Sequence, residues 1–407
     1  MKRLYFIYLL LFVLSGHTIA CTTAIISGKG TIDGRPLLYK HRDTSALQNK
    51  LMAFSDGKYN YIGIVNSTDK TGKEVWGGYN STGFAIMNSA SYNLNENEVG
   101  PEEREGIVIK MALQQCATLA DFEKMLETLP KPLYVNANLG VIDAQGGAAY
   151  YETGDYTFKK YDANDPSIAP MGYIIRTNYS FSGDRARDKG LSRYQAAEPL
   201  FYNAALSGSL SYRFLLQDVS RHLTHGLTGT NLCDIMPQDT SKTVFAAFRD
   251  YIPRYSTSSV IVVQGVKKAE PASLTTMWTI LGSPLTTVVV PVWLNKDNWY
   301  PSTMIADETG NAKLCDWSLK LKKQLFPIDR GEGNDYINLA ALITADGNGI
   351  LQKIKPIENQ ILNKSDSLLN HWRKDGYNAA ELKEFCKWVD NLIQQYYSFS
   401  PSFSSSF

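Results

Sequence analysis

ACTTAIIS, residues 20–27, is the stretch that decides how the rest of the chain is interpreted. Before it, residues 1–20 have a basic start, an apolar run from Leu4 to Leu14 and a small residue, Ala20, at the end. These are the proportions of an export signal, and the apolar run is too short to span a bilayer as a helix. We therefore expect cleavage after Ala20, so that Cys21 becomes the first residue of an exported chain, periplasmic or secreted.

A cysteine at the N-terminus carries a thiol and a free α-amine on neighbouring atoms. The amine has an ordinary pKa of roughly 7.7–8.0 and accepts the proton of the thiol near neutral pH. An amine beside a hydroxyl or thiol is one established way of activating a nucleophile. Cys21 is therefore the candidate nucleophile.

The same junction has two other interpretations. In a lipoprotein, the cysteine after the cleavage site is lipidated and its amine is acylated, and such a site normally has an aliphatic residue where Thr18 stands. Thr18 and Ala20 instead suit ordinary signal peptidase. A cysteine with neither role is the third interpretation, and the junction alone does not choose among them.

Charge and composition argue against several classes of partner. The 407-residue chain has 41 basic and 40 acidic side chains and a formal net charge of +1. This balance gives no electrostatic basis for binding nucleic acid or an anionic membrane. No apolar run after the leader is long enough to span a membrane, and no glycine pattern matches a nucleotide-binding loop. The sequence thus indicates neither a membrane span nor a cofactor.

The cysteines and histidines suggest no metal site. None of the five cysteines has CxxC spacing, and their odd number leaves at least one thiol unpaired, for which Cys21 is the candidate. The other four are either buried thiols or two disulfides. His222 and His225 have helical i,i+3 spacing but no third ligand nearby. Outside the expected export signal, His41 is the one histidine close to Cys21 in sequence, and we give a papain-like Cys–His pair little weight.

The residues after Cys21 predict a hairpin. Residues 21–27 form a β-branched strand, residues 29–36 a turn containing Asp-Gly, and residues 37–40 a second strand. Such a hairpin returns Arg42 and Asp43 to the neighbourhood of Cys21. A carboxylate there would orient the amine, and a cation would stabilise a thiolate. The alternative is a solvated polar loop.

Beyond the hairpin, short strands alternate with pairs of helices, which predicts an α+β fold with helices layered on largely antiparallel sheets. We expect one domain at 21–345 followed by a C-terminal helical extension at 346–407. Helices are expected at 102–115, 119–129, 191–206, 212–225 and 356–397, and further strands at 59–66, 74–78, 83–89, 134–143, 148–153, 156–161, 172–177, 243–250, 258–264, 274–281 and 286–294.

Several motifs follow one another in a fixed order. They are CTT at 21–23, KGTIDG at 29–34, WGGYN at 76–80, GFAIMN at 83–88, NLGVIDAQGG at 138–147, Thr177-Asn178 and WTILGSP at 278–284. On these motifs, residues 21 to about 293 resemble the cysteine members of the N-terminal nucleophile (Ntn) hydrolases. These include the choloylglycine hydrolase and penicillin V acylase family and the acyl-coenzyme A:6-aminopenicillanate acyltransferase family. The resemblance implies a four-layer αββα sandwich.

The resemblance also implies residue roles. Cys21 matches the nucleophile, Asp43 the aspartate that positions the α-amine, Asn178 a catalytic-site asparagine and Asn88 an oxyanion-hole residue. One departure concerns the cations, because relatives often have an arginine three residues before the aspartate, where this chain has Lys40. Arg42 lies one residue before Asp43 and is the other candidate to face the thiol. Arg193 and Arg254 compete for the position of a second family arginine.

The function that follows is cleavage of a linear amide C–N bond in a small molecule, such as an N-acyl amide or a conjugate. The alternatives are acyl transfer on the same fold, and a lipid-anchored binding protein in which Cys21 is acylated and catalytically silent. The acyl group and the amine are not encoded in any motif. Relatives are often multimeric, so a homo-oligomer stays open.

Overall fold

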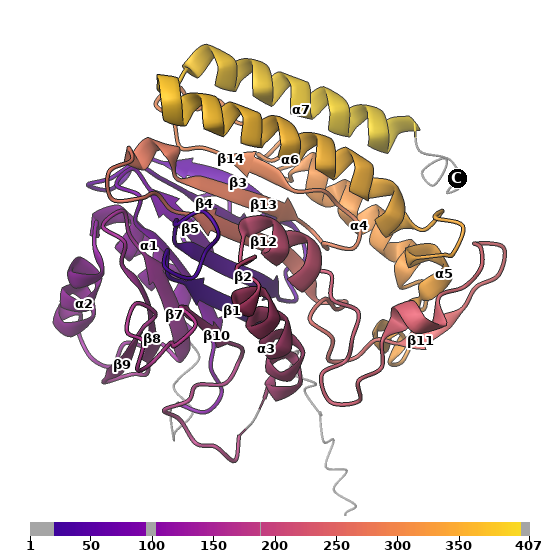
Figure 1. The fold of residues 1–407 in the computed structure, drawn as a ribbon, viewed down its shortest axis with the longest axis horizontal. Helices are drawn as coiled ribbons and strands as arrows, with labels where there is room; N and C mark the ends of the chain where they lie inside the picture. The colour runs from indigo at the N-terminus through magenta and orange to yellow at the C-terminus, as the bar shows by residue number, and fades with distance from the viewer. Residues whose placement is uncertain (1–19, 95–102, 188, 400–407) are drawn as a thin grey trace, which may run out of the picture.

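Two antiparallel sheets lie face to face between layers of helices (Figure 1). The computed structural model describes residues 20–94, 103–187 and 189–399. The expected export signal lies outside the described residues except for Ala20. No helix within the described ranges is both long and apolar enough to cross a membrane.

The first sheet has six strands and contains the predicted hairpin. Strand β1 lies between β10 and β2, and its first residue, Cys21, is paired with Arg42 on β2. In the same register Thr23 is paired with Lys40. The strand order is β10 (Tyr173–Arg176), β1 (Cys21–Ile26), β2 (Leu37–Asp43), β12 (Thr257–Gln264), β13 (Thr276–Leu281) and β14 (Val290–Val292).

The second sheet has seven strands in sequence order, each antiparallel to the next. Most successive strands are joined by short connections, because antiparallel neighbours need only a hairpin turn, whereas α1 and α2 lie in the long connection between β6 and β7. The strands are β3 (Asn49–Phe54), β4 (Tyr61–Asn66), β5 (Gly77–Asn80), β6 (Ala85–Ala90), β7 (Ala137–Ile142), β8 (Ala148–Thr153) and β9 (Phe158–Asp162).

Each sheet buries both faces. Ile25 and Leu38 of the first sheet share one core with Ile62 and Met87 of the second. The outer face of the second sheet packs in a separate core against α1 (Glu105–Gln115) and α2 (Leu119–Thr128). Helix α2 begins as expected at Thr118, whose side chain accepts a hydrogen bond from Asp121 N in a capping box.

The other helices cover the outer face of the first sheet, so that the four-layer αββα arrangement is confirmed. The long helices α6 and α7 run side by side along one edge of the molecule (Figure 1), and Trp372 and Phe385 from them pack on Trp293. This layer contains α3 (Leu191–Leu206), a π-helix (Phe214–Val219), α4 (Lys313–Leu325), α5 (Leu339–Leu342), α6 (Ile350–Asp375) and α7 (Ala379–Phe399). A small two-stranded sheet pairs β11 (Phe245–Ala247) with β15 (Tyr336–Asn338).

Several expected elements are wrong in extent, and of the strand expected at 243–250 only β11 (Phe245–Ala247) forms. The helix expected at 212–225 is a π-helix that ends at Val219, because Ser220 donates both its backbone N–H and its hydroxyl to the carbonyl of Leu215. His222 and His225 therefore lie beyond the helix and not on one helical face. The strand expected at 286–294 shortens to Val290–Val292, because the hydroxyl of Thr286 bonds to Ser318 of α4.

The cysteines form no disulfide. All five are free in the structure, which decides against the two-disulfide alternative. Cys116, Cys315 and Cys386 are buried like Cys21, whereas Cys233 is exposed.

Candidate active site

Cys21 lies at the first position of an interior strand, where its side chain is 2% exposed. Its backbone nitrogen donates a hydrogen bond of 2.9 Å to Oδ1 of Asn178. In the described chain this nitrogen belongs to the peptide bond with Ala20, and it is the atom that the expected cleavage would turn into an α-amine. The structure places this nitrogen and the thiol of Cys21 in the same buried site.

Asn178 follows β10 and holds the nitrogen of Cys21 with its carbonyl oxygen. Its Nδ2 donates to the carbonyl of Ala90 at 2.7 Å, while Oδ1 accepts from Cys21 and from Nη2 of Arg193 at 2.6 Å. A guanidinium is a donor only, so the contact with Arg193 fixes which end of the amide is the oxygen. In this arrangement the carbonyl oxygen of Asn178 faces the nitrogen of Cys21, and one N–H of its Nδ2 is bonded to Ala90.

Arg193 reaches this centre from α3. Its Nη1 donates to the backbone carbonyl of Cys21 and to the hydroxyl of Thr22 at 3.1 Å. Burial lowers the pKa of Arg193 to about 10, with Arg254 acting in the same direction and Asp43 opposing it. The helix starts after Gly190, whose φ of +89° places it in the left-handed region that favours glycine. A Cβ there would lie 2.7 Å from Nη2 of Arg193, so glycine leaves the path of the guanidinium open.

Lys40 and Arg42 share the face of β2 that points toward the second sheet, because strand side chains alternate. Nζ of Lys40 donates to the carbonyl of Trp76 and to Oδ1 of Asn88, both at 2.6 Å. Burial lowers the pKa of Lys40 to about 7, and Arg42 lowers it further while Cys21 opposes the shift.

Arg42 lies over the ring of Trp76 at 4.8 Å and donates to the side chains of Asn49 and Asn66. Burial lowers the pKa of Arg42 to about 10, and the neighbouring Cys21 opposes this shift. Since Arg42 is also the cross-strand partner of Cys21, both predicted cations are near the thiol.

Asp43 and His41 point to the opposite face of β2. Oδ1 of Asp43 accepts a 2.7 Å hydrogen bond from the hydroxyl of Thr257, and its Oδ2 lies 3.2 Å from Nε of Arg254. Burial raises the pKa of Asp43, although Arg254 and Arg193 act against that shift. Asp43 is thus no solvated loop residue, and the structure places Arg193 beside Cys21 and Arg254 beside Asp43.

His41 does not form a pair with Cys21. Its Nε2 lies 3.1 Å from the hydroxyl of Thr257, and burial lowers the pKa of His41 to about 3. Because it lies on the other face of the strand from Cys21, the geometry speaks against a papain-like arrangement.

A buried carboxylate that the sequence analysis did not single out for a role holds the loop after Asn178. Glu152 accepts hydrogen bonds from Nε of Arg176 at 2.7 Å and from the backbone of Phe181 and Ser182 at 2.9 and 2.8 Å. The available sequence signal was an acidic residue in the buried strand 148–153, since such a charge is almost always paired.

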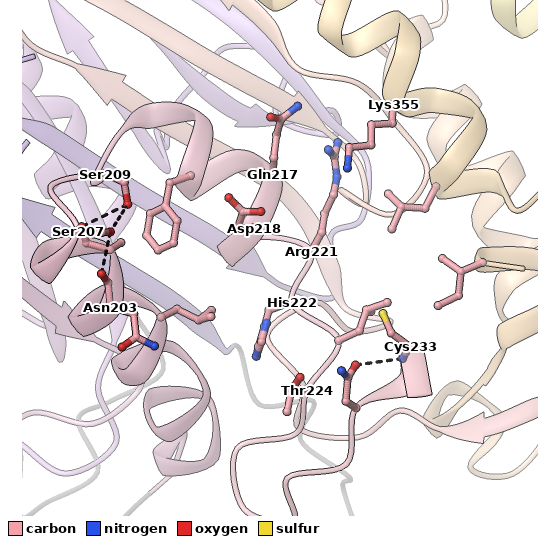
Figure 2. Close-up of a pocket in the computed structure, with 17 residues that line it drawn as sticks. Asn203, Ser207, Ser209, Gln217, Asp218, Arg221, His222, Thr224, Cys233 and Lys355 are labelled. Atoms are coloured by element: carbon pink, nitrogen blue, oxygen red, sulfur yellow. Dashed lines mark hydrogen bonds between the residues drawn. The ribbon is translucent and has the colours of Figure 1, made fainter. Parts of the chain in front are cut away.

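A cavity of about 600 Å³ lies elsewhere, in the helical layer that covers the first sheet (Figure 2). Asp218, Arg221 and Lys355 line it together with His222 and Cys233, and none of the residues around Cys21 does. Burial lowers the pKa of His222 and raises the pKa of Cys233, so neither is tuned as a base or a nucleophile. We therefore place the candidate active site at Cys21.

No family model matches the chain, and no curated protein matches it. Among solved structures, penicillin V acylase from Agrobacterium tumefaciens is 14% identical, with 68% of this chain and 86% of that chain covered and a TM-score of 0.38. A mutant of conjugated bile acid hydrolase from Clostridium perfringens is 10% identical over 68% of this chain and 93% of that one, with a TM-score of 0.36. The Caenorhabditis elegans ortholog of N-acylethanolamine-hydrolyzing acid amidase is 13% identical over 49% and 89%, with a TM-score of 0.33.

By their printed names the three solved structures are an acylase, a hydrolase and an amidase. At these identities and TM-scores, we base the function below on the residues of the site.

Proposed function

We propose that this chain is an exported Ntn-type hydrolase that cleaves the C–N bond of a linear amide, with Cys21 as nucleophile and its own α-amine as base. The observation that carries the proposal is the hydrogen bond from the nitrogen of Cys21 to Asn178, in a buried site that also contains Lys40, Arg42 and Arg193. Nucleophile, base and orienting group are thereby within hydrogen-bonding reach.

The reaction proceeds in two halves. The α-amine takes the thiol proton, Sγ of Cys21 bonds to the amide carbon, and an N–H of Asn88 stabilises the oxyanion. The α-ammonium then gives its proton to the leaving nitrogen, the C–N bond breaks and a thioester stays on Cys21. Water adds to the thioester as the amine accepts its proton, and the carboxylic acid leaves with the thiol restored.

In this scheme Asp43 does not contact the thiol and acts on Cys21 through neighbouring residues. With Arg254 and Thr257 it forms a buried polar centre on the side of β2 opposite the thiol, and Arg193 links that centre electrostatically to the backbone of Cys21. We assign Asp43 to orienting the charged amine together with Asn178 and Arg193.

A lipid anchor at Cys21 fits this environment poorly. The residue is almost fully buried, and its nitrogen is bonded inside the protein to Asn178. A diacylglyceryl thioether must instead reach a membrane surface, and an acylated nitrogen cannot act as a base. This burial favours a free N-terminal cysteine.

The proposal is tested on a chain that begins at Cys21. Penicillin V, an N-acylethanolamine and a conjugated bile acid serve as amide probes, and release of the amine is measured. We expect turnover of at least one probe and none by Cys21→Ala, with an unchanged circular dichroism spectrum. Turnover by Cys21→Ala at the original rate would place the chemistry elsewhere.

A matched control isolates the α-amine. A chain that keeps Ala20 has the same thiol but a peptide nitrogen in place of the amine, and we expect it to be inactive. Full activity of that chain would contradict the role of the amine. Intact mass of the protein from its native host then tests export, cleavage and lipidation together, and a diacylglyceryl increment would favour the anchored binding protein. Appearance of the acyl group on an added amine would indicate acyl transfer.

A further inference from the structure

Lys40 makes a contact whose chemistry fixes the orientation of Asn88. A lysine ammonium donates hydrogen bonds and accepts none. Both of its partners here are oxygens at 2.6 Å, the carbonyl of Trp76 and Oδ1 of Asn88. The amide of Asn88 therefore has its oxygen on Lys40 and its Nδ2 directed elsewhere.

Among the described residues, Nδ2 of Asn88 has no hydrogen-bond acceptor of its own. The residue is 4% exposed, and within the described ranges no acceptor is hydrogen-bonded to this nitrogen. Strand β6, which contains Asn88, packs against β1 and β2, and Lys40 is close enough to Cys21 for the two to interact electrostatically. A free amide N–H next to a nucleophile is what stabilisation of an oxyanion requires.

We propose that Lys40 is a positioning residue that holds the amide of Asn88 with its N–H toward the reacting carbonyl, and that this role outweighs its electrostatic effect on the thiolate of Cys21. The inference rests on the function proposed above and assigns to Lys40 a role distinct from that of Arg42. Arg42 makes no hydrogen bond to Asn88 within the described residues, and its side chain donates to Asn49 and Asn66.

The contact between Lys40 and Asn88 depends on the protonation state of Lys40. A neutral lysine amine has a lone pair, so it can accept an N–H from Asn88 and no longer enforces one orientation. Burial lowers the pKa of Lys40 to about 7; the charged groups that face it are Cys21 on β1, Arg42 on β2 and Glu105 on α1. Burial also raises the pKa of Glu105 to about 7. The enforced orientation is therefore lost as the pH rises through the neutral range.

Two reagents distinguish an effect on oxyanion stabilisation from an effect on the thiol. Acylation of Cys21 by p-nitrophenyl acetate passes through an oxyanion, whereas alkylation by iodoacetamide displaces iodide without one. We expect Lys40→Met to slow acylation about 100-fold, the effect of losing one oxyanion donor. Alkylation at the same pH should slow far less than acylation, because carboxamidomethylation needs only the thiolate, on which Lys40 acts through its charge alone, and no oxyanion donor. Lys50→Met, which removes a buried lysine of β3 that bonds to Ser67, is the matched control and should change neither rate.

Two further measurements exclude a merely structural effect. Lys40→Arg keeps a charged donor and should restore acylation, with the ratio of acylation to alkylation no longer falling above pH 7. In an Asn88→Ala background, Lys40→Met should slow acylation no further, because the residue acts through Asn88.

The outcomes are separable. Parallel loss of acylation and alkylation in Lys40→Met would overturn the inference in favour of a direct action on the thiol, and multiplying effects of Lys40→Met and Asn88→Ala would overturn it as well. Release of p-nitrophenolate by Cys21→Ala at the wild-type rate would overturn the proposed function together with the inference.

Discussion

Two buried arginine–carboxylate centres in this protein differ in how completely their atoms are satisfied. In the helical layer, Glu358 of α6 accepts two hydrogen bonds at each oxygen, from Arg221 at 2.6 Å on both, from Gln217 at 3.1 Å and from Val289 N at 3.0 Å. Beside Cys21, Asp43 has one hydrogen bond from Thr257 and a 3.2 Å contact with Arg254. Oδ2 of Asp43 and Nε of Arg193 and Arg254 make no hydrogen bond within the described residues.

We interpret the fully bonded pair as structural and the less completely bonded pair as part of the proposed site. A fully bonded pair repays its desolvation and fixes α6 on the sandwich. Buried polar atoms without partners are costly, and they persist where function requires them. In the centre at Cys21, Nε of Arg193 is such an atom, and Oδ2 of Asp43 faces Nε of Arg254 at 3.2 Å without a hydrogen bond, whereas both oxygens of Glu358 are hydrogen-bonded.

The largest expected effect comes from Asp43→Asn, which keeps the size of the side chain and removes its charge. If Asp43 helps to orient the charged amine, turnover should fall about 10²–10⁴-fold, the usual contribution of positioned acid–base groups. KM should change less, because proton transfer suffers more than binding. Steady-state kinetics on whichever amide probe is turned over measures both.

Asp250→Asn is the matched control for that variant. Asp250 is half exposed and lies 3.8 Å from the same Arg254, so its loss changes the arginine without touching Asp43. Wild-type turnover in both variants would show that the buried centre at Asp43 has no part in the reaction.

The second prediction concerns the stability of the protein and the ion pair between Glu358 and Arg221. Glu358→Gln leaves Arg221 buried and unpaired, which should lower the free energy of unfolding by about 3–5 kcal/mol. Urea unfolding followed by circular dichroism measures the loss. The rate at which iodoacetamide alkylates Cys21 in the folded protein should not change, because the pair is not in the site. A fall in that rate without a loss of stability would reverse the assignment of the two centres.

The sequence predicted the part of the site that lies on one hairpin, but not the part that comes from distant segments. A Cys-Thr-Thr strand and an Asp-Gly turn were enough to bring Arg42 opposite Cys21, because hairpin register is local. The choice between Arg193 and Arg254 depended on where α3 and the segment before β12 pack, which no local pattern encodes. Both arginines belong to the site, one beside the α-nitrogen and one beside Asp43.

The fold shows the same limit. The α+β class followed from periodicity, and Thr118 marked the start of α2 because a capping box is a local signal. Ser220 ended the helix predicted at 212–225 by bonding back to Leu215, which apolar spacing alone did not reveal. The C-terminal helices were expected, although their apolar faces gave no indication that Trp372 and Phe385 would meet at Trp293.

The smallest effect tests whether the centre around Asp43 titrates near neutral pH. Lys322 of α4 is buried, with Nζ 3.4 Å from the carbonyl of Thr257 and 4.5 Å from the centre of the Tyr255 ring. Burial lowers the pKa of Lys322 from 10.5 to about 7, although Cys315 and Asp43 oppose the shift. Above pH 7 the unfolded chain keeps a proton that the native protein has lost. The free energy of unfolding therefore rises with pH, by roughly 1 kcal/mol between pH 7 and pH 8 from this group.

Lys322→Met removes the titrating group from the native and the unfolded protein. The increase in the free energy of unfolding between pH 7 and pH 8 should therefore be smaller than in the wild type by about 1 kcal/mol, as measured by urea titrations at pH 7.0, 7.5 and 8.0. Lys323→Met changes an exposed lysine of the same helix and should keep the wild-type slope. Equal slopes in wild type and Lys322→Met would show that Lys322 stays charged in the native protein. In that case the ammonium is held by Asp43, and the carboxylate beside Cys21 is better satisfied than its hydrogen bonds indicate.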